Sequence, residues 1–335
     1  MTRFYLYTFF FTISLFTNFL SAQNTSSAFN FLSIAPSSRA NALGGVNISV
    51  VEKDLSLVVL NPSLLGKEMT GTVSLNYMHY ISDINLGAAL YAIPFLDRGA
   101  LAFGASFLDY GNFKLTSPSN EILGDFSAKD MNFHALVGYD ISERWRGGAQ
   151  TKLLYSVYDT YSSIALAVDL GINYFNPYNE FSFSATIKNL GAQLKQFNDI
   201  RETLPYDFQI GVSKMLAHAP LRFSLTGINL LDYDDDFIVD DNVEIKTKNG
   251  FIKKGLRHLV FAGEFIPNDN FYFALGYNYG RNFYFNSLDS SPFAGFSCGA
   301  GVKIKAFDIN ASVARYNRSG TSLLITVNTN INYFR

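Results

Sequence analysis

The chain has 335 residues, of which 26 are lysine or arginine and 28 are aspartate or glutamate, so its formal net charge is −2. This balance excludes a strongly basic nucleic-acid-binding protein, and the single cysteine, Cys298, excludes a fold held by internal disulfides. Beyond the N-terminus no apolar run reaches the ~18 residues of a membrane-spanning helix. A membrane protein of this aromatic-rich composition would therefore have to be a closed barrel.

Residues 1–22 have the layout of a secretory signal peptide. Arg3 supplies a positive charge, an apolar run extends from Phe4 to Phe19, and Ala22 places a small residue just before a cleavage site at Gln23. The run is shorter than the ~20 apolar residues that span a bilayer comfortably, which disfavours an N-terminal membrane anchor. We therefore expect the protein to leave the cytoplasm and to lose this segment.

Residues 23–69 lack a regular alternation and carry turn-forming residues at Pro36, Gly44-Gly45 and Asn61-Pro62. Because they also contain hydrophobic pieces such as Val46–Val51, we do not expect them to hang free in the periplasm. The sequence predicts a plug inside the barrel mouth or a segment along its periplasmic rim, and it leaves both open.

From about residue 70 onward, apolar and polar residues alternate with period two. Near the C-terminus, Leu323, Ile325 and Val327 fall on one face, whereas Thr326 and Asn328 fall on the other. Such alternation is typical of strands with one apolar face. The predicted strands are 70–80, 84–93, 98–108, 129–141, 144–157, 160–175, 179–190, 204–216, 220–230, 257–267, 270–280, 294–305, 307–316 and 320–334. We therefore expect 70–335 to form an all-β transmembrane antiparallel up-and-down β-barrel of about 14 strands.

The predicted connections differ in length on the two sides of the sheet. After even-numbered strands they are short, whereas after several odd-numbered strands they are long and polar, at 109–128, 191–203, 231–256 and 281–293. In outer-membrane barrels the short turns lie in the periplasm and the long loops lie outside. This pattern predicts a Gram-negative outer-membrane location with extracellular long loops and periplasmic termini. A soluble β-sandwich also has alternating strands, but it would not sort its connections in this way.

The inward-facing positions carry small and polar residues together with charges of both signs. By parity, the inward charges are Lys152, Asp169, Lys188, Arg222, Glu264, Lys303 and Asp308. Such a lumen is compatible with a water-filled path and with a cross-linked, filled interior. Cys298 has the opposite parity, so we expect it to face lipid as a small apolar residue.

The sequence carries no pattern for catalysis or cofactor binding, because no Gly-x-Ser-x-Gly elbow, His-Glu-x-x-His pair or phosphate loop occurs. His79, His134 and His258 fall near the loop-side ends of well-separated strands, and His218 falls in a short turn, so they lack the spacing of a metal site. We expect no enzyme, no cofactor and no metal site, and we expect these histidines to pack at the rim or interface.

The segment 231–256 is the most distinctive predicted loop, because a run of acidic residues precedes a group of lysines. It lacks the glycine and the closing glutamate of a calcium-binding loop. A solvated loop that is kept soluble by its charge is the simpler interpretation. The alternative is a partner-binding surface, for which the candidate residues are Asp234, Asp235, Asp236, Phe237, Ile238 and Val239.

The predicted N-terminal segment also carries a recognisable run. It reads Phe29-Asn30-Phe31-Leu32, then Ser38 to Gly45, then Asp54 and Asn61 to Leu65. This run resembles the start of the PorV/PorQ branch of the FadL-like outer-membrane barrels, which belongs to the type IX secretion system, although Ser63 stands where that family usually has alanine. Weaker similar pieces are Lys188 to Gly191 and Gly263 to Phe265. The positions that match the family motif are Ser38, Arg39, Gly44, Gly45, Asp54, Asn61 and Pro62.

The resemblance implies a non-enzymatic outer-membrane component that anchors a surface partner of the PorZ type through its extracellular loops. The implied partners are outer-membrane lipid, that attachment-complex protein and other components of the type IX secretion machinery. Two alternatives remain: a FadL-like barrel for the uptake of hydrophobic molecules, and a PorV-like shuttle of exported cargo. The small, polar inward faces argue against an apolar channel through the barrel. The structure of the lumen has to decide between these functions.

Overall fold

The computed structural model describes residues 29–119, 121–197, 202–231, 251–286, 293–315 and 320–334. The predicted signal peptide, 1–22, and the candidate partner-binding residues Asp234–Val239 lie outside these ranges. Within them, no helix is long and apolar enough to cross a membrane.

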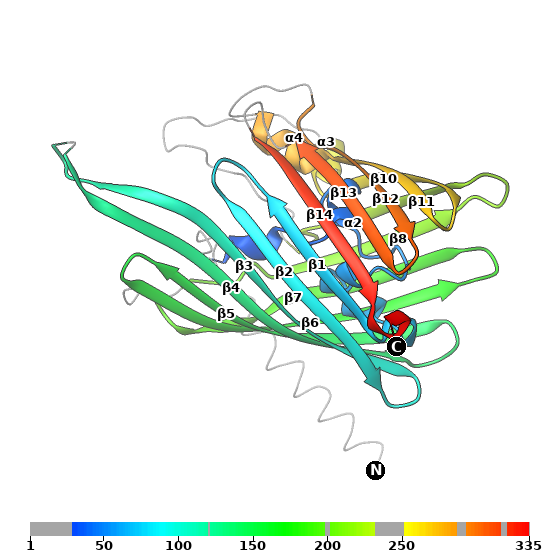
Figure 1. The fold of residues 1–335 in the computed structure, drawn as a ribbon. Coiled ribbons are helices and arrows are strands. Elements are labelled where there is room, and N and C mark those ends of the chain that lie inside the picture. The colour runs from blue at the N-terminus through cyan, green and yellow to red at the C-terminus, as the bar shows by residue number, and fades with distance from the viewer. Residues whose placement is uncertain are drawn as a thin grey trace, which may run out of the picture.

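Fourteen antiparallel strands close into one barrel (Figure 1). They are β1 (Thr72–His79), β2 (Asn85–Phe95), β3 (Gly99–Thr116), β4 (Ile122–Asp140), β5 (Trp145–Tyr158), β6 (Tyr161–Asn176), β7 (Phe181–Lys195), β8 (Asp207–Met215), β9 (Leu221–Gly227), β10 (Leu259–Asn268), β11 (Phe271–Asn278), β12 (Phe296–Ile304), β13 (Phe307–Arg315) and β14 (Thr321–Asn330). Each strand pairs with its neighbours in the sequence, and β1 pairs with β14 to close the barrel. The predicted all-β fold is confirmed.

Side chains alternate across the barrel wall as the sequence predicts. On β1, Leu75 and Tyr77 are exposed on the outside, whereas Ser74 and Asn76 are buried on the inside. Cys298 of β12 is exposed on the outer face, as its parity predicts. An apolar outer face around a polar interior is the arrangement of a barrel that lies in lipid.

The segment 109–128, predicted as a long loop, is instead most of a hairpin in which β3 and β4 continue past the other strands (Figure 1). The prediction is wrong because a β-bulge interrupts the alternation: Asp109 lies opposite Lys129, but Asn112 lies opposite Ser127. Gly111 has a φ of +79°, a conformation that glycine adopts without a steric penalty. β7 likewise extends five residues beyond its predicted end at 190, into the predicted loop 191–203.

Two short helices, α3 (Phe251–Arg257) and α4 (Tyr279–Asn286), replace parts of the predicted loops 231–256 and 281–293. We call the barrel end where they lie the long-loop end, and the opposite end the short-turn end. The last turn of the chain is a 3-10 helix, η6 (Ile331–Phe334), where the sequence predicts that the final strand continues.

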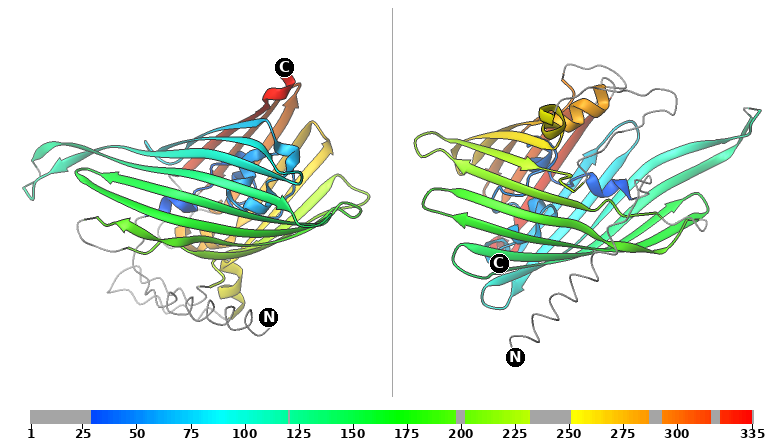
Figure 2. Two further views of the ribbon diagram at one scale, coloured as in Figure 1. Left: turned by 90° about the horizontal axis from the view of Figure 1, so that it is seen from below. Right: turned by 180° about the vertical axis from the view of Figure 1, so that it is seen from behind.

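The described part of the N-terminal segment, from residue 29 onward, lies inside the barrel (Figure 2). We call residues 29–71 the plug. It contains the short helical turns η2 (Asn30–Ser33), α2 (Ser38–Ala42), η3 (Leu55–Val59), η4 (Pro62–Leu64) and η5 (Lys67–Met69). Ser37, Asp54 and Asn61 cap three of these turns, because each side chain accepts a hydrogen bond from a backbone N–H two or three residues later. The lumen is therefore a filled interior.

Candidate functional site

The plug packs into the barrel through a hydrophobic core that it shares with the barrel wall. Its side chains Leu43, Leu55 and Leu65 are fully buried, and they belong to one cluster with Leu90 of β2 and Leu136 of β4. Burial of apolar area contributes about 25 cal/mol per Å², so a core of this kind stabilises the plug inside the lumen.

Inward-facing glycines let the plug backbone approach the wall closely. A Cβ atom on Gly148 of β5 would overlap the backbone of Pro62, and one on Gly276 of β11 would overlap the backbone of Gly44. Gly148 and Gly276 are therefore contact positions for the plug.

A closed network of four charged side chains joins the plug to β9 and β10. Arg39 Nε donates to Glu264 Oε1 at 2.8 Å, Arg222 Nε donates to Glu264 Oε2 at 2.6 Å, and Arg222 Nη1 donates to Glu52 Oε1 at 2.8 Å. Arg39 Nη2 lies 3.5 Å from Glu52 Oε1, and its guanidinium lies 4.2 Å from the centre of the Tyr272 ring. We call this the plug ion network.

The network fixes the charge of both plug residues. Burial alone would lower the pKa of Arg39, but the carboxylates of Glu264 and Glu52 raise it above its ordinary value. Burial alone would raise the pKa of Glu52, but Arg39 and Arg222 hold it below its ordinary value. Because Arg39 and Glu264 are buried beside each other, loss of one of them would leave an uncompensated buried charge, whereas Glu52 is partly exposed.

All seven residues of the family motif lie in the plug, where they contact the wall or shape the turns. The Ser38 backbone N–H donates to Thr326 Oγ1 at 2.9 Å, and Asn328 Nδ2 donates to Asp54 Oδ1 at 2.9 Å. Arg39 belongs to the plug ion network, and Pro62 follows the capping residue Asn61 at the start of η4. Gly44 and Gly45 have φ values of +93° and +88°.

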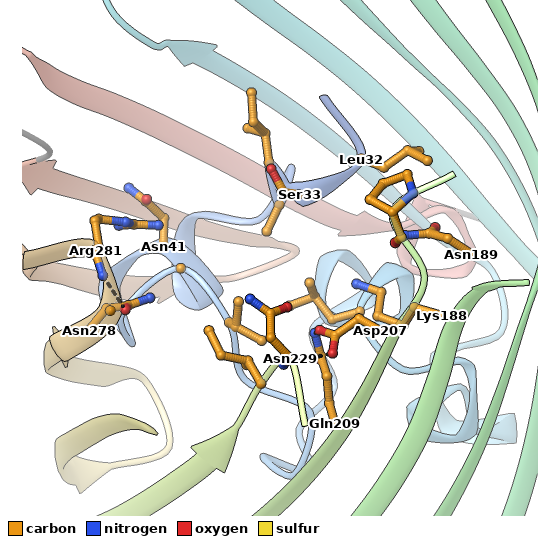
Figure 3. A pocket seen from close by; sticks show the side chains of 18 of the residues that line it. Leu32, Ser33, Asn41, Lys188, Asn189, Asp207, Gln209, Asn229, Asn278 and Arg281 are labelled. Atoms are coloured by element: carbon orange, nitrogen blue, oxygen red, sulfur yellow. Dashed lines mark hydrogen bonds between the residues drawn. The ribbon is translucent and has the colours of Figure 1, made fainter. Parts of the chain in front are cut away.

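A pocket of about 340 Å³ lies at the long-loop end between the plug and the wall (Figure 3). We call it the mouth pocket. Leu32, Ser33 and Asn41 of the plug form one side, and residues of β7, β8 and β11 form another. Its charged lining residues are three cations and one anion, Lys188, Arg257, Arg281 and Asp207.

A β-bulge between β6 and β7 shapes one wall of this pocket. Val168 lies opposite Leu190 and Leu170 lies opposite Ile187, so Lys188 and Asn189 together face Asp169. Both Lys188 and Asn189 are buried inside the barrel, and Asn189 has a φ of +58°, which is uncommon for a residue other than glycine. The bulge thus places two consecutive polar residues on the lumen side.

Asn189 and Asp169 also hold a second lysine. Lys152 Nζ lies 2.6 Å from Asp169 Oδ2 and donates to Asn189 Oδ1 at 2.8 Å. The Asn189 backbone N–H donates to Asp169 Oδ1 at 2.7 Å. Asp169, predicted to be an inward charge, is therefore the counter-ion of Lys152.

The structure corrects the interpretation of one histidine. His134 does not pack at a rim or interface but is buried inside the barrel, opposite Lys152 on the neighbouring strand. Among the described residues, no group of three or more histidine, cysteine, aspartate or glutamate side chains could hold a metal ion. Sequence reasoning missed the mouth pocket and the position of Asn189, for which the only signal was the stretch Lys188 to Gly191.

No protein-family model matches the sequence, and no curated protein matches it. Among solved structures, the chain is similar to the CymD monoaromatic hydrocarbon channel, with a TM-score of 0.52 and 12% identity over 90% of this chain and 97% of that one. It is also similar to the deltaS2S3 mutant of the TodX monoaromatic hydrocarbon channel, with a TM-score of 0.50 and 11% identity over 88% of this chain and 98% of that one. A Pseudomonas aeruginosa FadL homologue gives a TM-score of 0.46 and 10% identity over 89% and 98% of the two chains.

The first two likenesses concern the fold. The chain has the closed β-barrel architecture of these two proteins, which are named as channels.

Proposed function

We propose that this protein is a plugged outer-membrane channel that binds a small, partly apolar molecule in the mouth pocket and admits it when the plug moves. The mouth pocket carries the proposal, because it is a cavity at the long-loop end that is lined by the plug itself. Support also comes from the fold, which is that of two channels named for monoaromatic hydrocarbons.

The size and lining of the mouth pocket suit a small ligand. Its volume of about 340 Å³ falls at the lower end of the ~300–1,000 Å³ that ligand pockets occupy. Leu32, Ile34 and Val46 of the plug provide apolar surface, and Asn189 and Asn229 of the wall provide polar groups. A ligand held there contacts the plug directly, so its binding could favour one plug position over another.

A matched pair of tryptophan substitutions tests this function. Ser33 lines the mouth pocket and is exposed to it, so Ser33→Trp should fill part of the cavity without touching the buried plug core. We expect a drop of about tenfold or more in the affinity for toluene and in its uptake into proteoliposomes. Ser119→Trp, at the exposed tip of the β3–β4 hairpin, should change neither. Equal binding and uptake in both variants would contradict the proposal.

A second candidate function is the anchoring of a surface partner of the PorZ type, as in the type IX secretion machinery. The observation that favours it is the projecting β3–β4 hairpin (Figure 1). Its large apolar side chains Phe113, Leu115, Ile122 and Leu123 are exposed. Exposed apolar side chains on a projecting element suit a protein interface.

Two deletions test the anchoring function. Removal of 112–126 or of 231–256 should release a co-purifying surface protein from the membrane, while the barrel still inserts and migrates as a heat-modifiable band. The second deletion removes Asp234–Val239, the partner-binding candidates of the sequence. A partner that stays bound after both deletions would rule out anchoring by these segments.

A further inference from the structure

A second, smaller cavity lies next to the mouth pocket, beneath residues 31–36 of the plug. Its volume is about 40 Å³, which exceeds the ~10–15 Å³ that one water molecule requires. The wall lines it with polar groups, including His134, Lys152 and Lys188, and the plug lines it with Phe31 and Leu32. We call it the lysine chamber. Lys188 and Leu32 line both cavities, so the chamber and the mouth pocket adjoin each other.

The two lysines of the chamber differ in how their charges are balanced. Lys152 is bound by Asp169 and Asn189. Lys188 is only 7% exposed, yet within the described part of the chain its ammonium group makes no ion pair and no hydrogen bond. Lys188 lines the mouth pocket, so an anion that enters this pocket can reach its ammonium group. An ammonium group that is largely removed from water and has no direct partner favours such an anion.

The neighbouring carboxylate of Asp207 interacts with Lys188 electrostatically but does not form an ion pair with it. Asp207 lies opposite Lys188 on the next strand, and its carboxylate instead accepts hydrogen bonds from Gln209 Nε2 and from the Asn229 backbone N–H. Figure 3 shows Lys188 and Asp207 side by side at the edge of the mouth pocket. His134 is also buried, and neither of its ring nitrogens has a partner.

We propose that the lysine chamber binds one carboxylate group of a small organic acid, with Lys188 as its counter-ion and a ring N–H of His134 as a second donor. The apolar body of the acid then lies against Leu32 and Ile34, in the mouth pocket. A carboxylate has two oxygens, which match one ammonium and one imidazole donor, and charge-assisted hydrogen bonds of this kind are among the strongest in proteins. This inference rests on the proposed function for the place of the apolar body.

The structure offers a reason to regard the chamber as a built site. The β-bulge turns Asn189 inward beside Lys188, which already faces inward by the regular alternation of β7. Asn189 has a left-handed conformation, and its hydrogen bonds to Asp169 and to the Pro205 carbonyl oxygen hold it there. Backbone strain of this kind is concentrated at binding sites. A barrel wall that binds no ligand would need neither the β-bulge nor a second lysine on its inner face.

The test compares benzoate with benzyl alcohol, which has the same ring and no charge, by calorimetry on the purified full-length barrel in detergent. We expect benzoate to bind about tenfold more tightly than benzyl alcohol. Lys188→Met, which keeps the length of the side chain, should abolish this preference. The matched control is Lys195→Met at the exposed end of the same strand, which should retain the preference.

His134→Gln provides a second variant, because glutamine keeps a donor but not the ring, and it should weaken benzoate binding by a smaller factor. Inorganic phosphate and chloride form the other arms of the experiment. Phosphate or chloride could compete with benzoate for the wild-type protein and fail to compete in Lys188→Met. That result would show that a free inorganic anion also occupies the chamber, and it would support an anion site.

The outcomes separate this inference from the proposed function. If benzoate and benzyl alcohol bind equally and Lys188→Met changes neither, the chamber holds only water and the inference is overturned, whereas the pocket function stands. If neither aromatic compound binds but phosphate binds through Lys188, the anion site stands and the pocket function fails. If none of the probes binds, both are overturned.

Discussion

The two halves of the barrel wall hold the plug by different means. Strands β8 to β14 contact it mainly through polar and charged side chains, such as Glu264, Ser312 and Asn328. Within the hydrophobic core that surrounds the plug, strands β2 to β4 contribute most of the apolar side chains of the wall, such as Leu90 and Leu136, and β11 adds Tyr272 and Ala274. Polar contacts are directional and fix one position, whereas apolar contacts depend on filled volume. The difference indicates that the polar half sets where the plug sits and the apolar half sets how tightly it packs.

The largest effect should follow from a change in the polar half. Glu264→Gln leaves Arg39 and Arg222 with only the partly exposed Glu52 as a shared carboxylate, and removal of one partner from a buried ion pair typically costs about 3–5 kcal/mol. We expect faster hydrogen exchange across α2 and more frequent channel openings in planar bilayers. Glu121→Gln, in the exposed tip of the hairpin, should behave as the wild type. Unchanged exchange in Glu264→Gln would show that the plug ion network does not position the plug.

A smaller effect should follow from a change in β5, the strand next to the apolar strands β2 to β4. Gly148→Val places a side chain against the backbone of Pro62, which cannot rotate away as a flexible side chain can. Overpacking of this kind costs about 1–3 kcal/mol. We expect a lower temperature of heat-modified migration and faster exchange at η4, with α2 unaffected. Gly87→Val is the matched control, because a Cβ there meets no atom within 4 Å. Equal effects at η4 and α2 would argue against two separately held regions.

The smallest effect concerns pH. Because the pKa of Glu52 is lowered in the folded protein, its contribution to plug stability is fully present above the ordinary value of 4.5 and is lost as the pH falls through the lowered value. Hydrogen exchange of the plug should therefore accelerate below about pH 4.5, and Glu52→Gln should reduce this acceleration without removing it, because Glu264 faces the same two arginines. An identical pH profile in wild type and variant would exclude Glu52 as a contributor.

The sequence predicted the fold well because alternation reports directly which side of a strand faces lipid. All fourteen predicted strands exist, and Cys298 lies where its parity places it. The prediction failed at bulges, since one extra residue reverses the parity on one strand and leaves it unchanged on the partner. For this reason the segment 109–128 was predicted to be a loop.

The candidate site was accessible to prediction only in part. Lys188 and Glu264 were assigned to the lumen from parity alone. Glu264 is paired with Arg39 of the plug, whereas Lys188 makes no ion pair among the described residues, and this difference depends on a register between plug and wall that cannot be predicted from the sequence. The bulge that turns Asn189 inward beside Lys188 also breaks parity. The motif residues Arg39 and Asn61 stood out in the sequence, and the structure explains them as contacts and caps of the plug.

The bulge at Tyr110 and Gly111 has a consequence for the depth at which the barrel sits. Below it, the outward residues of β3 are apolar, as at Phe103 and Phe107, whereas above it they are Asn112 and Lys114. Phe113 stacks on Phe126 on the opposite face, 5.3 Å between ring centres. The bulge therefore marks the height at which the hydrocarbon core of the bilayer gives way to the head groups. Within the bilayer the apolar residues of this hairpin lie on its outer face, and above the bilayer they lie on its inner face.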